Sequence, residues 1–188
     1  MLNVLIEGAR AYGVTLSDTK VSQFERYLSW LTEHSVHVNL VASAEPELVV
    51  RRHFLESIAL GAALREREIM REGARTLDLG AGAGFPGVVL KIVWPDLHMT
   101  LLDATAKKTA FLATLVEALG LEGVEVVTGR AEALAHDPRW RGRFDLVVAR
   151  AVAPLAVLVE LGLPFARVGG WRPAWPRSRP DRGARARR

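Results

Sequence analysis

A run of glycines that directly follows an apolar segment constrains the fold of this chain more than any other feature. Residues 75–90 read RTLDLGAGAGFPGVVL, in which residues 76–79 predict a buried strand and four glycines follow within eight residues. Pro86 suits the first turn of a helix, because its φ is fixed and its missing N–H has no intrahelical partner there. A strand, a glycine turn and a helix in this order let backbone amides approach an anionic or nucleotide-like ligand at the carboxyl end of the strand.

The glycine turn fits two nucleotide-binding patterns. Residues 82–87 satisfy G-x-G-x-x-G, the dinucleotide fingerprint, which favours an NAD(P) enzyme. Asp78 extends the pattern to D-x-G-x-G-x-G, which resembles the first motif of class I S-adenosylmethionine (SAM) methyltransferases. A long helical segment also precedes the strand, whereas a dinucleotide-binding unit usually opens its domain. Both patterns require an acidic residue at the end of the next strand to bind ribose hydroxyls, and Asp103 fills that position.

Composition limits the class of protein. The chain has 188 residues, of which 49% are hydrophobic, so one globular core with a small extension is expected. It contains no cysteine, which excludes disulfides, thiolate metal sites and a cysteine nucleophile, and we expect no bound metal. No apolar stretch approaches about 18 residues and the N-terminus lacks the features of a signal peptide, so we expect a cytoplasmic enzyme with no membrane contact.

Apolar periodicity and turn signals predict an α/β fold. Helices are expected over residues 2–11, from Ser17 or Asp18 onward, and over 49–64. Strands are then expected to alternate with helices: strands at 75–79, 97–103, 123–128 and 144–149, and helices at 106–119, 131–134 and 154–163. Such alternation indicates a parallel, doubly wound, Rossmann-like sheet, here with its C-terminal strands missing. The predicted organisation is a helical extension (1–73), a SAM-binding methyltransferase core (74–168) and a tail (169–188).

The second helix carries an aromatic and apolar stripe, which predicts core packing and not a base-stacking surface. Its members are Val21, Phe24, Leu28 and Leu31, with Tyr27 and Trp30 alongside. In residues 34–41, HSVHVNLV, polar and apolar side chains are mixed, with Asn39 at the centre of the segment. We interpret this segment as a crossover from polar to apolar sequence after the second helix.

The formal net charge of +4 comes from the C-terminal residues. From Arg167 onward the chain has eight arginines and one aspartate, whereas the preceding part has 17 basic and 20 acidic residues, a net charge of −3. The overall basicity is therefore no argument for RNA binding. After Val168 there is no Leu, Ile, Val or Phe. We expect residues 169–188 to be an aberrant, disordered tail that arises from a frameshift after about Gly170; a genuine basic RNA-binding arm is the alternative.

Several separated segments resemble one family, the bacterial 16S ribosomal RNA guanine-N7 methyltransferases (RsmG, also called glucose-inhibited division protein B). The segments are NLV at 39–41, RHFLES at 52–57, LDLGAGAGFPG at 77–87, LDATAKK at 102–108, GRAE at 129–132 and ARAVAP at 149–154. The combination of R-H-x-L-[DE]-S with D-x-G-x-G-x-G-[FL]-P-G is specific, and the resemblance runs from the first helix to about Gly170. Most relatives have Asp at the position of Glu56 and often Thr at that of Val41, which are mild changes.

The resemblance implies SAM as the cofactor and 16S ribosomal RNA, in the small subunit or its precursor, as the partner. The sequence does not determine the oligomeric state, and a monomer is favoured. The resemblance assigns the SAM contacts to Gly80, Phe85, Asp103, Ala104, Thr105, Ala131, Glu132 and Arg150. Gly80 would let the loop backbone approach the methionine moiety, and Asp103 would accept hydrogen bonds from the ribose hydroxyls. Residues 131–132 would border the adenine.

Arg52, His53 and Arg150 are the candidate catalytic residues. Guanine N7 has a lone pair and carries no proton, so its attack on a sulfonium methyl group needs no general base, and catalysis is expected to depend on positioning. We therefore interpret these three side chains as orienting groups for cofactor, base or phosphate. Lys107 and Lys108 suit phosphate contacts, although a solvated face is equally consistent with them.

The sequence leaves two other functions open besides the RNA methyltransferase. An NAD(P)-binding Rossmann oxidoreductase would need a substrate domain and a catalytic Tyr–Lys or His–Asp pair, and neither is visible. A non-catalytic SAM-fold module would retain RNA without transferring a methyl group.

Overall fold

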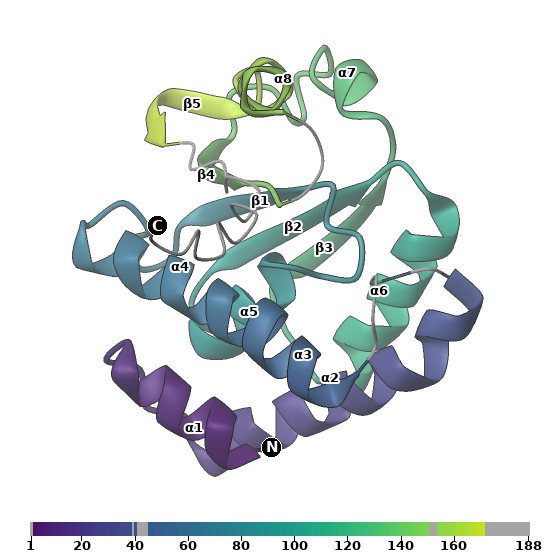
Figure 1. Cartoon of the computed structure of the whole chain (residues 1–188). Helices are drawn as coiled ribbons and strands as arrows, with labels where there is room; N and C mark the ends of the chain where they lie inside the picture. The colour runs from purple at the N-terminus through teal and green to yellow at the C-terminus, as the bar shows by residue number, and fades with distance from the viewer. Residues whose placement is uncertain (1, 39, 41–44, 151–153, 172–188) are drawn as a thin grey trace, which may run out of the picture.

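The computed structural model describes residues 2–38, 40, 45–150 and 154–171, with the side chains of 35–38 and of residue 171 excepted. Its centre is a five-stranded sheet in the order β3-β2-β1-β4-β5, and every neighbouring pair of strands is parallel (Figure 1). The strands are β1 (Arg75–Leu79), β2 (His98–Asp103), β3 (Val124–Thr128), β4 (Phe144–Val148) and β5 (Ala166–Trp171). The order reverses beside β1, so the ligand site of this doubly wound sheet is expected at the carboxyl end of that strand.

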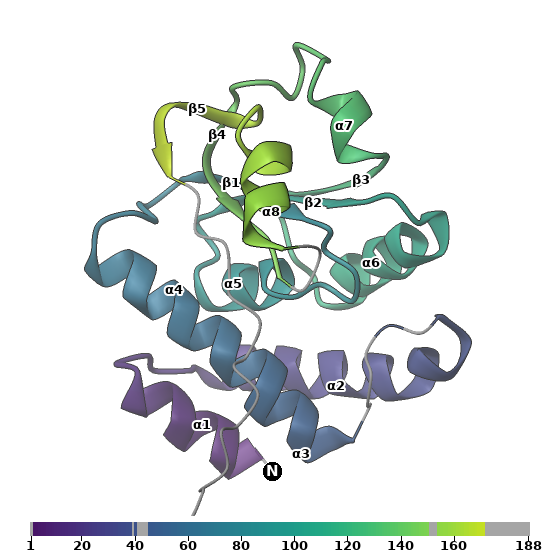
Figure 2. The same ribbon diagram turned by 45° about the horizontal axis from the view of Figure 1, so that its top comes forward.

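In the described residues, four α-helices and one π-helical turn precede the sheet, and four α-helices connect its strands. The first group is α1 (Leu2–Ala11), α2 (Asp18–Val38), α3 (Pro46–Val49) and, after the π-helical turn η1 (Val50–Leu55), α4 (Glu56–Glu66). The second group is α5 (Gly87–Val93), α6 (Ala106–Ala118), α7 (Ala131–Leu134) and α8 (Leu155–Gly162). Figure 2 shows α7 and α8 on one side of the sheet, α5 and α6 on the other, and the first group as an outer layer beyond α5 and α6.

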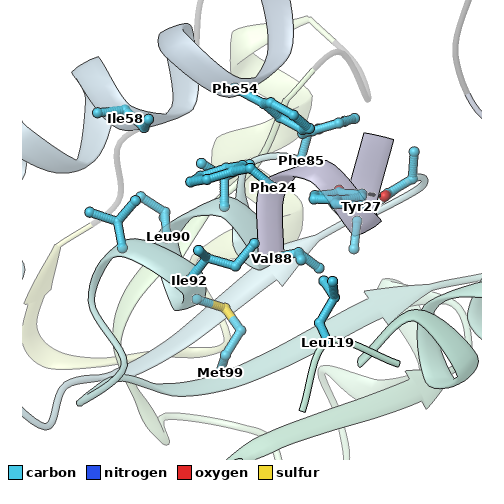
Figure 3. Packing of buried hydrophobic residues seen from close by; sticks show 14 of the residues in the cluster. Phe24, Tyr27, Phe54, Ile58, Phe85, Val88, Leu90, Ile92, Met99 and Leu119 are labelled. Carbon is cyan, nitrogen blue, oxygen red and sulfur yellow. Dashed lines mark hydrogen bonds between the residues drawn. The ribbon is translucent and has the colours of Figure 1, made fainter. Parts of the chain in front are cut away.

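Alternation of side chains along the strands divides the core between the two faces of the sheet. Leu77 and Leu79 of β1 pack with Phe165 in the cluster under α7 and α8, whereas Thr76 and Asp78 point to the opposite face. On that opposite face the predicted aromatic stripe of α2 is confirmed as core. Phe24 and Tyr27 are buried with residues of η1, α4 and α5 (Figure 3), and Leu31 is buried in the same cluster. The predicted helical extension thus shares one apolar cluster with the sheet.

The predicted elements before residue 150 are observed with small shifts of their ends, and one helix is longer than expected. Helix α2 continues to Val38 and so includes most of residues 34–41, for which the pattern predicted a crossover. The helix packs on α5 and α6, and this segment continues it. The Ser17 hydroxyl accepts a hydrogen bond from the Lys20 N–H (3.4 Å), which favours Ser17 as the residue that caps this helix. Asn39 and residues 41–44 lie outside the described part.

Strand β5 was not predicted, and it crosses the expected start of the tail at residue 169. Its backbone pairs with β4, with a bulge between Phe144 and Leu146. A Cβ at Gly170 would come within 3.1 Å of three backbone carbonyl oxygens, two of them in β4. Glycine usually weakens a strand, but at this position β4 approaches so closely that only a residue without a side chain fits. Residues 172–188, the remainder of the predicted tail, lie outside the described residues.

Candidate active site

The loop after β1 places successive backbone N–H groups at the carboxyl end of the sheet. Gly80, Gly82 and Gly84 have φ values of +73°, +56° and +102°, which L side chains rarely adopt. The N–H groups of Gly80 and Ala81 both donate to the Leu102 carbonyl oxygen at the end of β2, at 2.8 and 2.9 Å. The glycines therefore form a tight turn anchored to the neighbouring strand, as the sequence predicted, and α5 begins directly after Pro86.

Asp103 ends β2 and braces this turn. Its Oδ2 accepts a hydrogen bond from the Gly82 N–H (3.0 Å) and its Oδ1 accepts one from the Thr105 N–H (2.8 Å). The side chain is largely buried, yet each carboxylate oxygen has a second lone pair for a further donor. Asp103 therefore keeps acceptor capacity for the ribose hydroxyls that the sequence assigned to it. It also holds the glycine turn in place, which the sequence did not indicate.

A cleft opens at this edge of the sheet, between the loops that follow β1, β2 and β3. It brings together five of the predicted cofactor contacts: Gly80, Asp103, Ala104, Ala131 and Glu132. The other residues that line it are Leu79, Leu102, Gly129, Arg130 and Leu161. Thr105 is not among the lining residues; its backbone orients the Asp103 carboxylate instead.

The remaining predicted residues form a second group around the Phe85 ring, on the side of the loop that faces α2 and η1. His53 stacks on Phe85 with a centroid distance of 4.7 Å, and Tyr27 stacks on it at 5.3 Å. The Arg150 guanidinium carbon lies 6.0 Å from the centroid of the same ring. Phe85 and Arg150 do not line the cleft that contains Asp103, so the structure separates the predicted residues into a cleft and this neighbouring cluster, which we call the Phe85 cluster.

Arg150 ties the end of β4 to the helical layer. Its Nη2 donates a 2.6 Å hydrogen bond to the Arg52 carbonyl oxygen and forms an ion pair of 3.1 Å with Glu56 Oε2. Arg52 thus enters the cluster through its backbone, and its side chain is exposed. Residues 151–153, which the family resemblance includes, lie outside the described part of the chain.

His53 is neutral in this environment. Burial first, and then the charges of Arg150 and Arg52, lower its pKa from 6.5 to about 4. Its Nδ1 is buried and has no hydrogen-bond partner among the described residues. An imidazole that stays neutral and stacks on Phe85 suits the predicted role of an orienting group, and it carries no proton to donate at neutral pH.

Two residues support the glycine turn in ways that the sequence did not indicate, and the first is Tyr27. Its ring belongs to the predicted stripe, but its hydroxyl donates a 2.7 Å hydrogen bond to the Ala83 carbonyl oxygen in the glycine turn (Figure 3). A Cβ on Gly84 would lie 2.6 Å from the same hydroxyl. The signal in the sequence was a tyrosine among residues that are otherwise apolar, because a buried phenol needs a polar partner.

The second is Asp78, whose carboxyl group lies beneath the turn. Oδ2 accepts a hydrogen bond from the Gly87 N–H (2.8 Å), and Oδ1 is buried without a partner among the described residues. Burial raises the pKa of Asp78 to about 7; the Gly87 hydrogen bond opposes this effect and the nearby Asp103 charge adds to it. The first acidic residue of the motif therefore holds the start of α5 against β1 and is absent from the lining of the cleft.

The raised pKa of Asp78 predicts how stability depends on pH. Between the ordinary pKa near 3.8 and about 7 the folded state holds a proton that the unfolded state has released, so stability falls as pH rises through this window. The slope contributed by this group approaches about 1.4 kcal/mol per pH unit at its steepest. Asp78→Asn should flatten that slope, because its amide oxygen can still accept from Gly87 without ionising.

Urea denaturation at pH 5 and pH 8 measures this effect. We expect Asp78→Asn to gain stability relative to the parent protein as pH rises from 5 to 8. The control is Asp145→Asn, since Asp145 is a partly exposed carboxylate on β4 that pairs with Arg167. A difference between Asp78→Asn and the parent that does not change with pH would contradict the assignment.

The donors and acceptors of the cleft fit SAM. Backbone approach at Gly80 leaves space for the methionine chain, the Asp103 carboxylate can accept from two ribose hydroxyls, and residues 131–132 follow β3 where an adenine would lie. Among the described residues no group of His, Asp and Glu could hold a metal ion.

Comparison with known proteins identifies the family. Residues 20–173 match the family described as rRNA small subunit methyltransferase G. The chain belongs to this family. It is 44% identical to the ribosomal RNA small subunit methyltransferase G of Caldanaerobacter subterraneus over 169 residues. This aligned region covers 90% of this chain and 69% of the relative. The corresponding protein of Roseiflexus castenholzii is 42% identical over 169 residues, or 90% of this chain and 70% of that one.

A solved structure shows the same fold with a distant sequence. The SAH-bound methyltransferase PaMTH1 of Podospora anserina superposes with a TM-score of 0.58 at 18% identity, over 85% of this chain and 62% of the other. The predicted fold class, a Rossmann-like class I SAM-dependent methyltransferase sheet with an N-terminal helical extension, is thereby confirmed. In the described part of the chain no helix is long and apolar enough to cross a membrane.

Proposed function

We propose that this protein transfers a methyl group from SAM to guanine N7 of 16S ribosomal RNA. The observation that carries the proposal is the cleft in which Gly80, Asp103 and residues 131–132 converge, in a chain that belongs to the small-subunit rRNA methyltransferase G family. The methyltransferase prediction is supported over the alternatives, since the family match and the fold of PaMTH1 both favour SAM over NAD(P). Ribosomal RNA as the substrate class also favours a cytoplasmic location.

The cleft residues would bind the cofactor through its ribose, adenine and methionine groups. Asp103 would accept from the ribose, the Ala131 and Glu132 backbone would border the adenine, and the open backbone at Gly80 would admit the methionine chain. When bound, SAM supplies an electrophilic methyl group on a sulfonium. Asp103 braces the turn through Gly82 and Thr105, so the turn is preorganised before the ligand arrives.

The Phe85 cluster would orient the reacting groups. Guanine N7 needs no proton removed, and the lowered pKa of His53 agrees with a catalyst that holds groups in line and moves no proton. Arg150 contributes a fixed positive charge beside Phe85, and the exposed Arg52 side chain is available for a phosphate. Rate then depends on the alignment of N7 with the methyl group.

Methyl transfer to small-subunit ribosomal RNA tests the proposal. RNA from a strain that lacks the modification should gain a methyl group from labelled SAM, and the N7-methylated guanosine should appear as one site of reductive strand scission. Asp103→Ala should lose SAM affinity by about 1.5–3 kcal/mol, the range for hydrogen bonds to a charged acceptor. The Asp103 variant should also melt earlier than the parent, because two turn hydrogen bonds are lost. RNA that is bound but not methylated by the parent protein would identify a non-catalytic module instead.

A further inference from the structure

The way Arg150 is held leaves part of its guanidinium available. Nη2 donates a hydrogen bond to the Arg52 carbonyl oxygen at 2.6 Å and forms an ion pair with Glu56 Oε2 at 3.1 Å. The Nε and Nη1 donors have no partner among the described residues, and neither is among the buried atoms without a partner. One edge of the fork is therefore anchored to the helical layer, while no described residue engages Nε or Nη1.

We propose that Glu56 is a positioning residue that acts through Arg150. By holding Nη2, it directs the Nε and Nη1 donors of Arg150 at an oxyanion in the active site. The inference rests on the proposed function. Glu56 begins α4 directly after η1, so its carboxylate reaches Arg150 from a segment that is fixed to the core by Phe54 and Ile58, both buried. The Glu56 and Arg150 side chains are 37% and 17% exposed, which places the pair at the edge of the site and not in bulk solvent.

Three contacts from three segments fix the guanidinium. Glu56 supplies a charge, the Arg52 carbonyl supplies a hydrogen bond, and the Phe85 ring in the glycine turn lies against the guanidinium at 6.0 Å. A planar fork held on one side presents its other donors in a defined plane, the geometry that binds carboxylate or phosphate oxygens in pairs. Two sources carry such an oxyanion here, the methionine carboxylate of SAM and a phosphate of the RNA.

Glu56→Ala removes the anchor at a partly exposed helical position where alanine is well tolerated. We expect oxyanion binding to weaken about tenfold, with Glu56→Gln within about threefold of the parent, because its amide oxygen can still accept from Nη2. SAM affinity from calorimetry without RNA, and KM for the RNA at saturating SAM, distinguish the two sources: the measurement that changes identifies the ligand. Glu47→Ala is the matched control, since it removes an exposed ion pair with Arg51 (2.9 Å) in the preceding helical segment.

A double-mutant cycle with Arg150→Lys separates positioning from a general structural effect. If Glu56 acts through the guanidinium fork, Glu56→Ala should change neither affinity nor KM by more than about twofold when Arg150 is already lysine. Equal losses in both backgrounds would overturn the inference, as would unchanged or tighter binding by Glu56→Ala, which would mean that Glu56 only screens the charge. A parent protein that neither binds SAM nor methylates RNA would refute the proposed function instead.

Discussion

Gly84→Ala is expected to lower the free energy of unfolding by about 2–5 kcal/mol, with overpacking contributing about 1–3 and the positive φ about 1–2. The backbone at Gly84 has φ +102°, and a Cβ there would lie 2.6 Å from both the Tyr27 hydroxyl and Val88 Cγ2. The Tyr27 side chain cannot easily move away from the added methyl group, because it is fully buried and its hydroxyl donates a hydrogen bond to the Ala83 carbonyl oxygen. In a protein of this size the melting temperature should fall by about 5–15 °C.

Thermal and urea unfolding measure the loss, and Gly120→Ala provides the matched control. Gly120 also has a positive φ (+61°), but no heavy atom lies within 4 Å of a Cβ built there. That variant should show the backbone strain alone, about 1–2 kcal/mol. Equal destabilisation at the two positions would mean that Tyr27 and Val88 accommodate the added methyl group without overpacking.

Gly80→Val is expected to abolish SAM binding, with a loss of at least about 100-fold in affinity, or about 2.7 kcal/mol. Gly80 lines the cleft and has φ +73°, so a branched side chain would both fill the space for the cofactor and resist the backbone conformation. The N–H of Gly80 is bonded to Leu102 at 2.8 Å, which prevents the turn from moving away without losing that bond. Calorimetric titration with SAM measures the effect.

Gly120→Val controls for the strain of a branched residue at positive φ, because Gly120 follows the C-cap of α6 and is not among the residues that line the cleft. It should destabilise the protein but leave SAM affinity within about twofold of the parent. Normal SAM binding by a folded Gly80→Val protein would show that the glycine run is only a turn. Loss of binding by both variants would instead reflect a general loss of structure.

The sequence predicted the features that depend on local order along the chain. The strand, the glycine turn and α5 were read from residues 75–93, because buried strands and positive φ values leave signals in neighbouring residues. Alternation of strands and helices gave the parallel sheet, since each parallel connection needs a crossover. Asp103 was predicted at the cleft because the carboxyl ends of adjacent parallel strands meet at one edge.

The sequence by itself therefore determined the family, four of the five strands and five of the residues that line the cleft, whereas the tertiary structure decided how these residues are held. The Glu56–Arg150 ion pair, the Tyr27–Ala83 hydrogen bond and the burial of Asp78 join segments that no local pattern relates. Strand β5 also needed its partner, since Gly169 and Gly170 weaken its own pattern and only pairing with β4 makes it a strand. The physical reason is that periodicity reports which face of an element is buried, while hydrogen bonds, ion pairs and pKa values depend on which groups meet across elements.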